Sequence, residues 1–498
     1  MKNISWAPVL MFCWLNASAN VITVNELGMV IADDGKCTLT EAITSANENL
    51  VSGQMIGECA AGDSGSDDIF FDLPQGQNTL FTDDELFPVV MEDLRIFGPG
   101  ADLLTIDAQQ FSQIFGLRAA FELSGVTLLN GEAAAGASIY QFTAHDLSLT
   151  DCMISGSSVS GSAGAIRVLG GETQNQVIIE GCDFIDNDAV DNGGVIHASA
   201  VSGRSLYLNL KDVNFIDNQS VSGSGGALTV VTNGTGEIDF DFDRVNFSGN
   251  QANINGGAIH MEGEGITGMI EGSSFNSNTA SISGGAVHWL DTGDIYSINN
   301  TFYQNVAQKF AGAIYARADQ GALATINLIN NSIIQNTVAT GVSSVGGGGV
   351  YSQNASTWIK NTLIAENQVV NGGVDCGGQL SSLGFNFVGN GSDCSLLTTS
   401  GDMVGSSGNV LLPNLSYVIS PVFGVYAIPN ILSPLINSGD PDGCDFGLPF
   451  TIDVDQLDLS RHQDPLDDNQ VFGRCDIGSV EVQSPDLIFY SGFENSAS

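Results

Sequence analysis

Three of the five histidines in this chain directly follow a glycine-rich step, at His197, His260 and His288. Where the Ile or Val of that step points inward along a strand, the next residue points outward. The same position in other copies of the step holds further residues, namely Tyr140, Arg167, Thr229, Tyr315 and Tyr351. We expect this column to bind a long glycan by stacking sugar faces on its rings. The alternative is structural, since aromatic residues suit parallel strands and stack on one another.

A second chemistry to consider is calcium-dependent cleavage of acidic polysaccharides. It needs carboxylates that converge on a cation and a base that removes a proton. Arg317 and Lys360 lie near expected strands, and Asp183, Asp186 and Asp188 fall within one repeat. These groups do not recur at one-repeat spacing, so a pectate-type lyase is the alternative function, and no residue is assigned as catalytic.

Residues of the same column are also candidates for binding a metal or a cofactor. The neighbouring pair His260 and His288 could hold a transition metal, but no Cys or carboxylate recurs at ligand spacing. We therefore assign no metal site and no cofactor, with calcium kept open because of the acidic composition.

The elements that position these residues come from a repeat of 27 to 32 residues with the pattern apolar-x-x-Asn followed by a Gly-Gly step. This period fits one turn of three short strands and predicts an all-β fold, a right-handed parallel β-helix (solenoid). Equivalent residues should then stack about 4.8 Å apart. An inner apolar stack would include Phe184, Phe215, Phe247, Phe275 and Phe302. A structural asparagine ladder, in the left-handed backbone of a tight corner, would contain Asn187, Asn218, Asn250, Asn278, Asn305, Asn336 and Asn367.

The start of the chain and its charge indicate export. Lys2, an apolar run and Ala17-Ser18-Ala19 predict a signal peptide over residues 1–19. No later stretch approaches the roughly 20 apolar residues of a membrane helix, so we expect no membrane-spanning segment in the mature chain. A formal net charge of −43 excludes nucleic acid as a partner, and a polyanion would need a bridging cation. The partner that we expect is an extracellular polysaccharide or a host or cell-surface component.

Eight cysteines remain after the signal peptide, in four local couples that we expect to form disulfides in an oxidising compartment. The couples are Cys37–Cys59, Cys152–Cys182, Cys376–Cys394 and Cys444–Cys475. Eight cysteines allow about 105 connectivities, so the pairing stays open. Cys152 and Cys182 each stand two residues before an inner-stack position, which predicts that they are neighbours on successive coils.

Both ends of the chain differ from the repeats and carry a family resemblance. CTLTEAITSAN, with a plausible helix start, closely resembles the CSLREA motif that opens many exported bacterial β-helix proteins, and FGPGADLLTIDA resembles their first coil. DCGGQLSSLGFNFVGNGSDCS, SPLINSGDP and GRCDIGSVE resemble the "choice-of-anchor Q" region of the same group. The repeats resemble those of polymorphic outer-membrane proteins. DLIFYSGFENSAS resembles the short tails of some exported gammaproteobacterial proteins.

This resemblance, which spans roughly residues 20–483, implies five regions. They are a signal peptide (1–19), an N-terminal CSLREA-like cap (20–94), β-helix coils (95–375), a disulfide-stapled C-terminal cap (376–483) and a tail (484–498). We expect a secreted protein, or one on the outer surface of a Gram-negative bacterium, with adhesion or extracellular glycan binding as its activity and no catalysis. A structural spacer is a third alternative.

Overall fold

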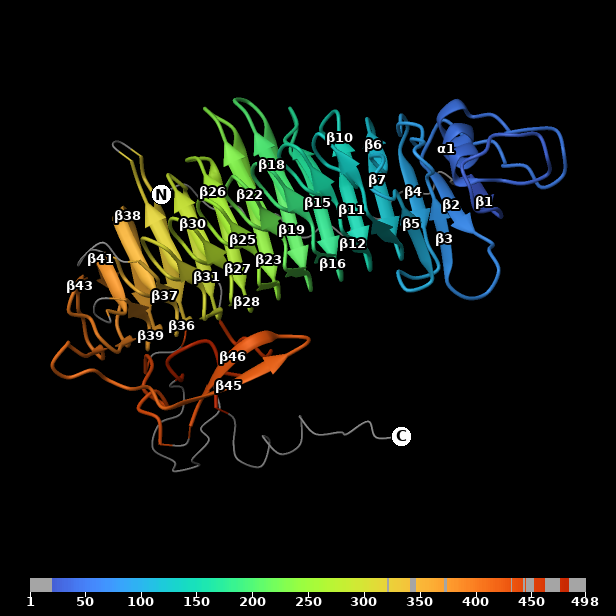
Figure 1. Cartoon of the computed structure of the whole chain (residues 1–498). Helices are drawn as coiled ribbons and strands as arrows, with labels where there is room; N and C mark the ends of the chain where they lie inside the picture. Colours follow the sequence, from blue (N-terminus) through green and yellow to red (C-terminus); the bar gives the residue numbers. More distant parts are fainter. Residues whose placement is uncertain are drawn as a thin grey trace, which may run out of the picture.

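The computed structural model describes residues 20–319, 322–340, 346–370, 374–430, 432–441, 444, 452–461 and 475–482. The chain winds through three parallel sheets, and each turn stacks on the one before it to form a long solenoid (Figure 1). The predicted all-β parallel β-helix is therefore confirmed. The predicted signal peptide and the tail from residue 484 lie outside the described residues.

Sheet I is built from the apolar-x-x-Asn segments and contains 13 strands. Its strands are β3 (Asn78–Phe81), β5 (Leu104–Asp107), β8 (Thr127–Leu129), β12 (Met153–Ser155), β16 (Asp183–Ile185), β20 (Asn214–Ile216), β24 (Asn246–Ser248), β28 (Ser274–Asn276), β32 (Thr301–Tyr303), β36 (Ser332–Ile334), β39 (Leu363–Ala365), β42 (Phe387–Val388) and β44 (Met403–Val404). Nine of the turns then each form a two-residue strand of the nine-stranded sheet III. These are β9 (Glu132–Ala133), β13 (Ser158–Val159), β17 (Asp188–Ala189), β21 (Gln219–Ser220), β25 (Gln251–Ala252), β29 (Thr279–Ala280), β33 (Val306–Ala307), β37 (Thr337–Val338) and β40 (Gln368–Val369).

Sheet II has 22 strands in two strips, because most turns cross it twice. The first strip follows the Gly-Gly steps and contains β6 (Phe115–Leu117), β10 (Ile139–Gln141), β14 (Ile166–Leu169), β18 (Ile196–Ala200), β22 (Leu228–Thr232), β26 (Ile259–Glu262), β30 (Val287–Leu290) and β34 (Ile314–Arg317). The second strip contains β1 (Val21–Val24), β2 (Asp67–Phe71), β4 (Leu94–Phe97), β7 (Phe121–Ser124), β11 (Leu147–Thr150), β15 (Asn175–Glu180), β19 (Ser205–Lys211), β23 (Glu237–Asp243), β27 (Ile266–Glu271), β31 (Asp294–Ile298), β35 (Thr325–Ile329) and β43 (Cys394–Leu397). Two longer strands continue from one strip into the other, namely β38 (Val350–Lys360) and β41 (Cys376–Ser382).

The strand register of sheet I stacks residues of the same type on one another in successive coils. Phe184 pairs with Phe215 and Phe247 with Phe275. Their rings stack in nearly parallel planes, with centroids 4.5 to 5.0 Å apart along the five phenylalanines, and all five are fully buried. The predicted inner stack is confirmed, and it forms one side of a continuous apolar core.

The predicted asparagine ladder is also confirmed. Each side-chain amide donates to the carboxamide oxygen of the next Asn at 2.9 to 3.0 Å, from Asn187 to Asn367, and Asp375 accepts the last bond. The prediction of a left-handed backbone at the Asn itself was wrong. Positive φ falls one residue earlier, as at Asp186 and Ser277, because the Asn must point inward to bond its neighbours.

The N-terminal end is closed by a helix, α1 (Leu39–Glu48), as the sequence predicts. Thr38 caps it through a reciprocal pair of hydrogen bonds with Glu41. Leu39, Ala42 and Ile43 are fully buried and join the solenoid core. The helix therefore shields the first coils from water.

After the last coil the described chain returns along the flank of the solenoid. β45 (Leu415–Ser420) and β46 (Gly424–Pro429) form an antiparallel hairpin on the outer face of sheet I (Figure 1). The backbone N–H of Val425 donates to Ser274 Oγ at 2.8 Å. Further along the flank, the fully buried Arg461 donates to Asn299 Oδ1 and faces Glu481.

Three predicted disulfides are present, Cys37–Cys59, Cys376–Cys394 and Cys444–Cys475. The fourth prediction was wrong, because Cys152 and Cys182 are free buried thiols. They are neighbours on successive coils as expected, and the backbone N–H of Cys152 donates to Cys182 Sγ at 3.3 Å. Adjacency alone therefore did not identify a disulfide.

Candidate functional site

The ring column occupies one register position of the first strip of sheet II, as predicted. Strand pairing places Tyr140 beside Arg167, and the column then continues in order through His197, Thr229, His260, His288, Tyr315 and Tyr351. Consecutive rings stack, with centroids 5.0 Å apart for His260 and His288 and 5.0 Å apart for His288 and Tyr315. The spacing of the glycine steps thus identified a real column.

Its exposure differs from the prediction. The relative accessibility of His288 is 2% and that of Tyr315 is 4%, and His260 and Tyr351 are also buried. Phe310, just before the glycine step that leads to Tyr315, stacks on both Tyr315 and Tyr351 and covers them. The expectation of an exposed ring surface was therefore wrong for these four residues, because their rings stack on one another and Phe310 covers the two tyrosines.

The other end of the column is half-buried. The Arg167 guanidinium lies 4.8 Å above the ring of Tyr140 and also contacts its hydroxyl group. Burial and the nearby Arg167 lower the pKa of His197 to about 4, and burial lowers the pKa of His288 well below its usual value. Because these low pKa values keep His197 and His288 neutral at pH 7, they favour a packing role for the two rings. A ligand role for Tyr140, Arg167 and His197 stays a prediction.

The groups considered for lyase chemistry are engaged elsewhere. Arg317 Nε donates to Asp319 Oδ1 at 2.8 Å. Lys360 is buried, with its Nζ 2.7 Å from Asp440 Oδ2. The three aspartates of one repeat do not converge on one point, because Asp183 lies on sheet I and Asp188 on sheet III. None of these contacts forms a calcium site beside a free base.

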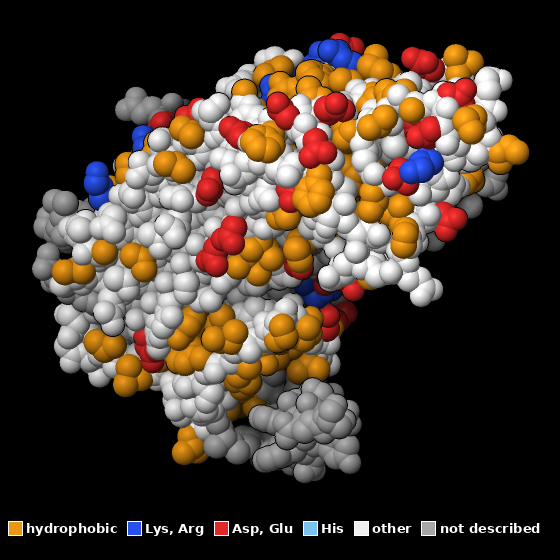
Figure 2. All heavy atoms as spheres, turned by 45° about the vertical axis from the view of Figure 1, so that its right-hand side comes forward, with side chains coloured by type: hydrophobic (Ala, Val, Ile, Leu, Met, Phe, Trp, Pro, Cys, Tyr) orange, Lys and Arg blue, Asp and Glu red, His pale blue; other side chains and the backbone are white. Residues whose placement is uncertain are grey.

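A groove opens instead on the outer face of sheet I, over the N-terminal coils. It is shallow and open to solvent, has a volume of about 860 Å³ and spans successive coils from β5 to β16. One wall is the turn Gly98–Asp102, whose Ala101 carbonyl accepts from Thr127 Oγ1 at 2.6 Å. Figure 2 shows that acidic side chains (red) are spread over the visible face of the molecule, whereas Lys and Arg side chains (blue) are fewer.

The groove lining combines apolar groups, such as Leu129 and Met153, with polar and acidic ones. It contains the carboxyl groups of Asp102, Asp151 and Asp183, together with hydroxyl groups such as those of Thr105 and Ser155. No Lys or Arg belongs to this lining. Glycines at the stacked corners, such as Gly125 with φ +60°, keep the wall low where side chains would otherwise project.

A ladder of polar side chains continues the groove toward the hairpin. Asn214 Nδ2 donates to Asp183 Oδ1 at 2.8 Å, and Asn246 Nδ2 lies 3.4 Å from Asn214 Oδ1. The next outward residue is Ser274, which the hairpin covers. We call the groove with Asp183, Asn214 and Asn246 the open strip. The sequence signal that could have found it is the residue before each Phe of the repeat, which must point outward.

Two further findings concern metals and membranes. In the part of the chain that the structure describes, no three His, Cys, Asp or Glu side chains are placed to hold a metal ion. No described helix has the length and apolar character needed to cross a membrane. Calcium binding therefore stays a prediction without a located site.

Comparison with known families matches residues 244–262 to the Chlamydia polymorphic membrane protein repeat. The matched segment covers β24, β25 and most of a coil, including the FSGN and GGAI motifs and His260. No curated protein and no solved structure gives a match. The CSLREA and choice-of-anchor Q assignments stay predictions. Over one repeat and in its solenoid fold, the chain is similar to the β-helix of polymorphic membrane proteins.

Proposed function

We propose that this protein is a secreted or surface-displayed, non-catalytic β-helix that binds an extended, neutral glycan along the open strip and thereby acts in adhesion. The observation that carries this proposal is the open groove of about 860 Å³, where carboxyl and hydroxyl groups alternate with apolar side chains and no Lys or Arg is present. The match to a polymorphic membrane protein repeat supports a place at the outer surface.

Charge determines the class of glycan. Carboxylate and amide oxygens accept hydrogen bonds from sugar hydroxyl groups, and bonds to charged acceptors are the stronger ones. A polyuronide would meet three carboxyl groups in the groove and a chain of net charge −43, which oppose it. A neutral polymer meets no such repulsion. Stacked coils repeat the same polar position about every 4.8 Å, which suits a ligand that also repeats.

The lyase alternative has less support. It requires a base free to remove a proton, whereas Arg317 and Lys360 are each held by a carboxylate. The ring column is also less suited to sugar stacking, since its central rings are buried against their neighbours.

Affinity electrophoresis of the full-length chain through gels that contain single polysaccharides tests the proposal. We expect retardation by at least one neutral glycan and none by polygalacturonate or alginate. Ultraviolet absorbance of unsaturated sugar ends, followed with and without calcium, provides the second readout. Retention by polyuronides alone, or a calcium-dependent rise in absorbance, would contradict a neutral-glycan binder.

A further inference from the structure

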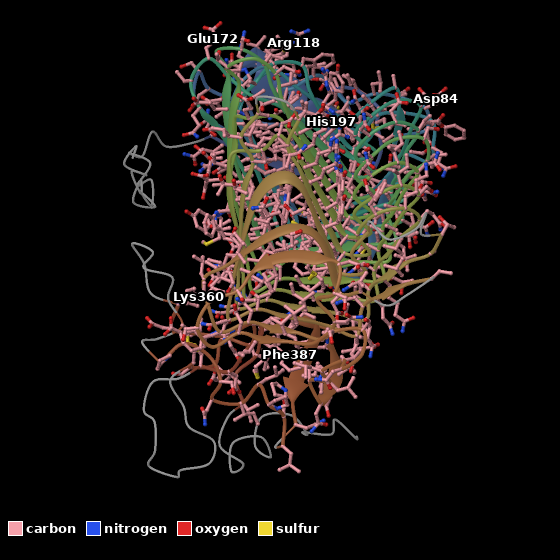
Figure 3. All side chains as sticks on the ribbon, turned by 90° about the vertical axis from the view of Figure 1, so that its left-hand side faces the viewer. Asp84, Arg118, Glu172, His197, Lys360 and Phe387 are labelled. Atoms are coloured by element: carbon pink, nitrogen blue, oxygen red, sulfur yellow. A yellow bond between two sulfur atoms is a disulfide. The ribbon has the colours of Figure 1, made fainter. Side chains whose placement is uncertain are left out.

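The outward column of sheet I continues beyond Asn246 and the open strip. Its further members are buried and are, in order, Ser274, Thr301, Ser332, Leu363 and Phe387. Figure 3 views the molecule from its C-terminal end and shows Phe387 on the side of the solenoid where the C-terminal segments lie. The hairpin covers Ser274. The next two members are covered by the described residues 452–461 and 475–482, which we call the C-terminal strap.

The strap supplies the hydrogen-bond partners of these covered hydroxyl groups. Thr301 Oγ1 donates to Gln456 Oε1 at 2.6 Å and lies 2.7 Å from Ser479 Oγ. The backbone N–H of Ser479 donates to Ser332 Oγ at 2.9 Å. The strap therefore occupies, at these coils, the polar column that remains exposed in the open strip.

One arginine and three carboxyl groups are buried where the strap meets the solenoid. Arg461, Asp455, Asp476 and Glu481 are each at most 2% exposed. Arg461 donates from Nε and Nη2 to Asn299 Oδ1, at 3.1 and 2.6 Å, and its Nη1 lies 3.5 Å from Glu481 Oε2. Because Asn299 belongs to a solenoid coil, this arginine joins the strap to the solenoid.

The three carboxyl groups differ in how well they are satisfied. Asp476 accepts from the backbone N–H groups of Asn437 and Val482, and Asp455 Oδ2 accepts from that of Glu481. Glu481 Oε2 accepts from the backbone N–H of Asp476 at 2.9 Å, but its Oε1 has no hydrogen-bond partner among the described residues. Glu481 is thus the carboxyl group for which a bound proton costs least.

The charges of this buried cluster do not balance. Within the described part of the chain, its three carboxyl groups face one guanidinium, and a fourth, Glu271 of β27, faces the same Arg461 from the solenoid. Glu271 also faces Asp241 and Asp243 of β23 and Asp458 of the strap. A carboxylate without a compensating cation is costly to bury and takes up a proton instead.

The pKa values follow this imbalance. Burial and the neighbouring Asp476 raise the pKa of Glu481 well above its usual value, and burial raises that of Asp476 to about 6. Burial and Asp243 raise the pKa of Glu271 to about 7, since the nearby Arg244 contacts Asp243 itself, with Nη1 2.8 Å from Oδ2. A released strap has ordinary carboxyl pKa values of about 4. The docked strap therefore holds more protons, and its docking weakens as the pH rises through the docked values.

We propose that the C-terminal strap is a pH-sensitive latch on the solenoid. Protonated Glu481 holds the strap in place, and loss of that proton loosens it and uncovers Thr301 and Ser332. The loosened strap then lets the open strip extend over further coils at high pH. This consequence rests on the glycan binding proposed above, whereas the latch itself depends only on the buried charges.

Hydrogen exchange of the full-length chain at pH 6 and pH 9, with each rate corrected for its intrinsic pH dependence, tests the latch. We expect the amides of residues 452–461 and 475–482 to lose protection at least about tenfold at pH 9, the effect of one unit of pKa difference. The amides of β16 and β20, far from the strap, should keep their protection and so exclude global unfolding.

Glu481→Gln carries an uncharged side chain of the same shape and should keep the strap protected at pH 9. The matched control is Asp458→Asn, because Asp458 is exposed on the same strap; it should follow the parent chain. Equal protection of the parent strap at both pH values would overturn the proposal, as would a Glu481→Gln strap that loosens at pH 9 like the parent. No glycan is present in this experiment, so its outcome is independent of the proposed function.

Discussion

The Nδ1 atoms of His260 and His288 lie 3.0 Å apart on adjacent strands, and both rings are buried. At that distance one ring nitrogen donates and the other accepts, so at least one of the two imidazoles is neutral. His260 Nε2 lies 3.4 Å from Glu262 Oε2, and this interaction lowers the pKa of Glu262. These two histidines therefore bond to protein groups, which makes them part of the packing of the coils.

Replacing His288 by Ser tests this structural role. The substitution removes a buried ring that stacks between His260 and Tyr315 and leaves a cavity. We expect a loss of about 3 kcal/mol in the free energy of unfolding, measured by urea denaturation. Thr229→Ser, at the same register position two coils before His288, is the control and should change stability far less. A fully stable His288→Ser protein that had lost glycan binding would instead indicate a ligand role.

The low pKa of His197 makes part of the stability depend on pH. Its pKa is about 4 in the folded chain, against about 6.5 in an unfolded one. As pH falls below 6.5 the unfolded state binds the proton first, so stability present above pH 6.5 is lost progressively toward pH 4. The expected loss from this group is about 3 kcal/mol at pH 4. Urea midpoints of the parent chain and His197→Gln, compared across this range, should converge as the pH falls. Parallel pH profiles would contradict the assignment.

Asn278 is the clearest position at which to test the asparagine ladder. Its amide group donates to Phe247 O and Asn305 Oδ1, and its Oδ1 accepts from the backbone and side chain of Asn250. Asn278→Ala leaves these partners unsatisfied in the core, and we expect a loss of about 3 kcal/mol. Asn276→Ala, on the outer face of the preceding strand β28, should cost less than about 1 kcal/mol. Equal effects would show that the inner ladder does not stabilise the coils.

The redox state of Cys152 and Cys182 can be read by differential alkylation and mass spectrometry. Both side chains are buried, so neither should react in the native protein. After unfolding without reductant, we expect both to be alkylated, while Cys37, Cys59, Cys376 and Cys394 remain unmodified. A peptide that joins Cys152 to Cys182 by a disulfide would contradict the structure.

Much of the fold was predictable from the sequence because a solenoid repeats its constraints. Phe184 and Asn187 recur in the same order in successive turns, and strand stacking then fixes their neighbours. The same logic gave the register of the ring column correctly. It did not predict that the rings are buried. Phe310 covers Tyr315 and Tyr351, but it belongs to the variable corner and carries no repeat signal.

The open strip was harder to predict because it depends on segments far apart in the chain. Asp183 and Asn214 lie one repeat apart, but the groove also needs the turn that begins at Gly98. Its far limit is set by Val425, which bonds to Ser274 across 151 residues of sequence. No local pattern contains that contact. The residues before each Phe were polar and visible in the sequence, but only the structure shows which of them stay uncovered.

Isothermal titration of the full-length chain with the neutral glycan that retards it most strongly tests the central claim, that the open strip binds glycan. Asp183 lines the groove, while Asp188 lies on the same coil but on sheet III and serves as the matched control. We predict that Asp183→Ala raises the dissociation constant at least about fivefold and that Asp188→Ala leaves it unchanged. Equal affinities for the parent chain and Asp183→Ala, or a loss confined to Asp188→Ala, would contradict the account.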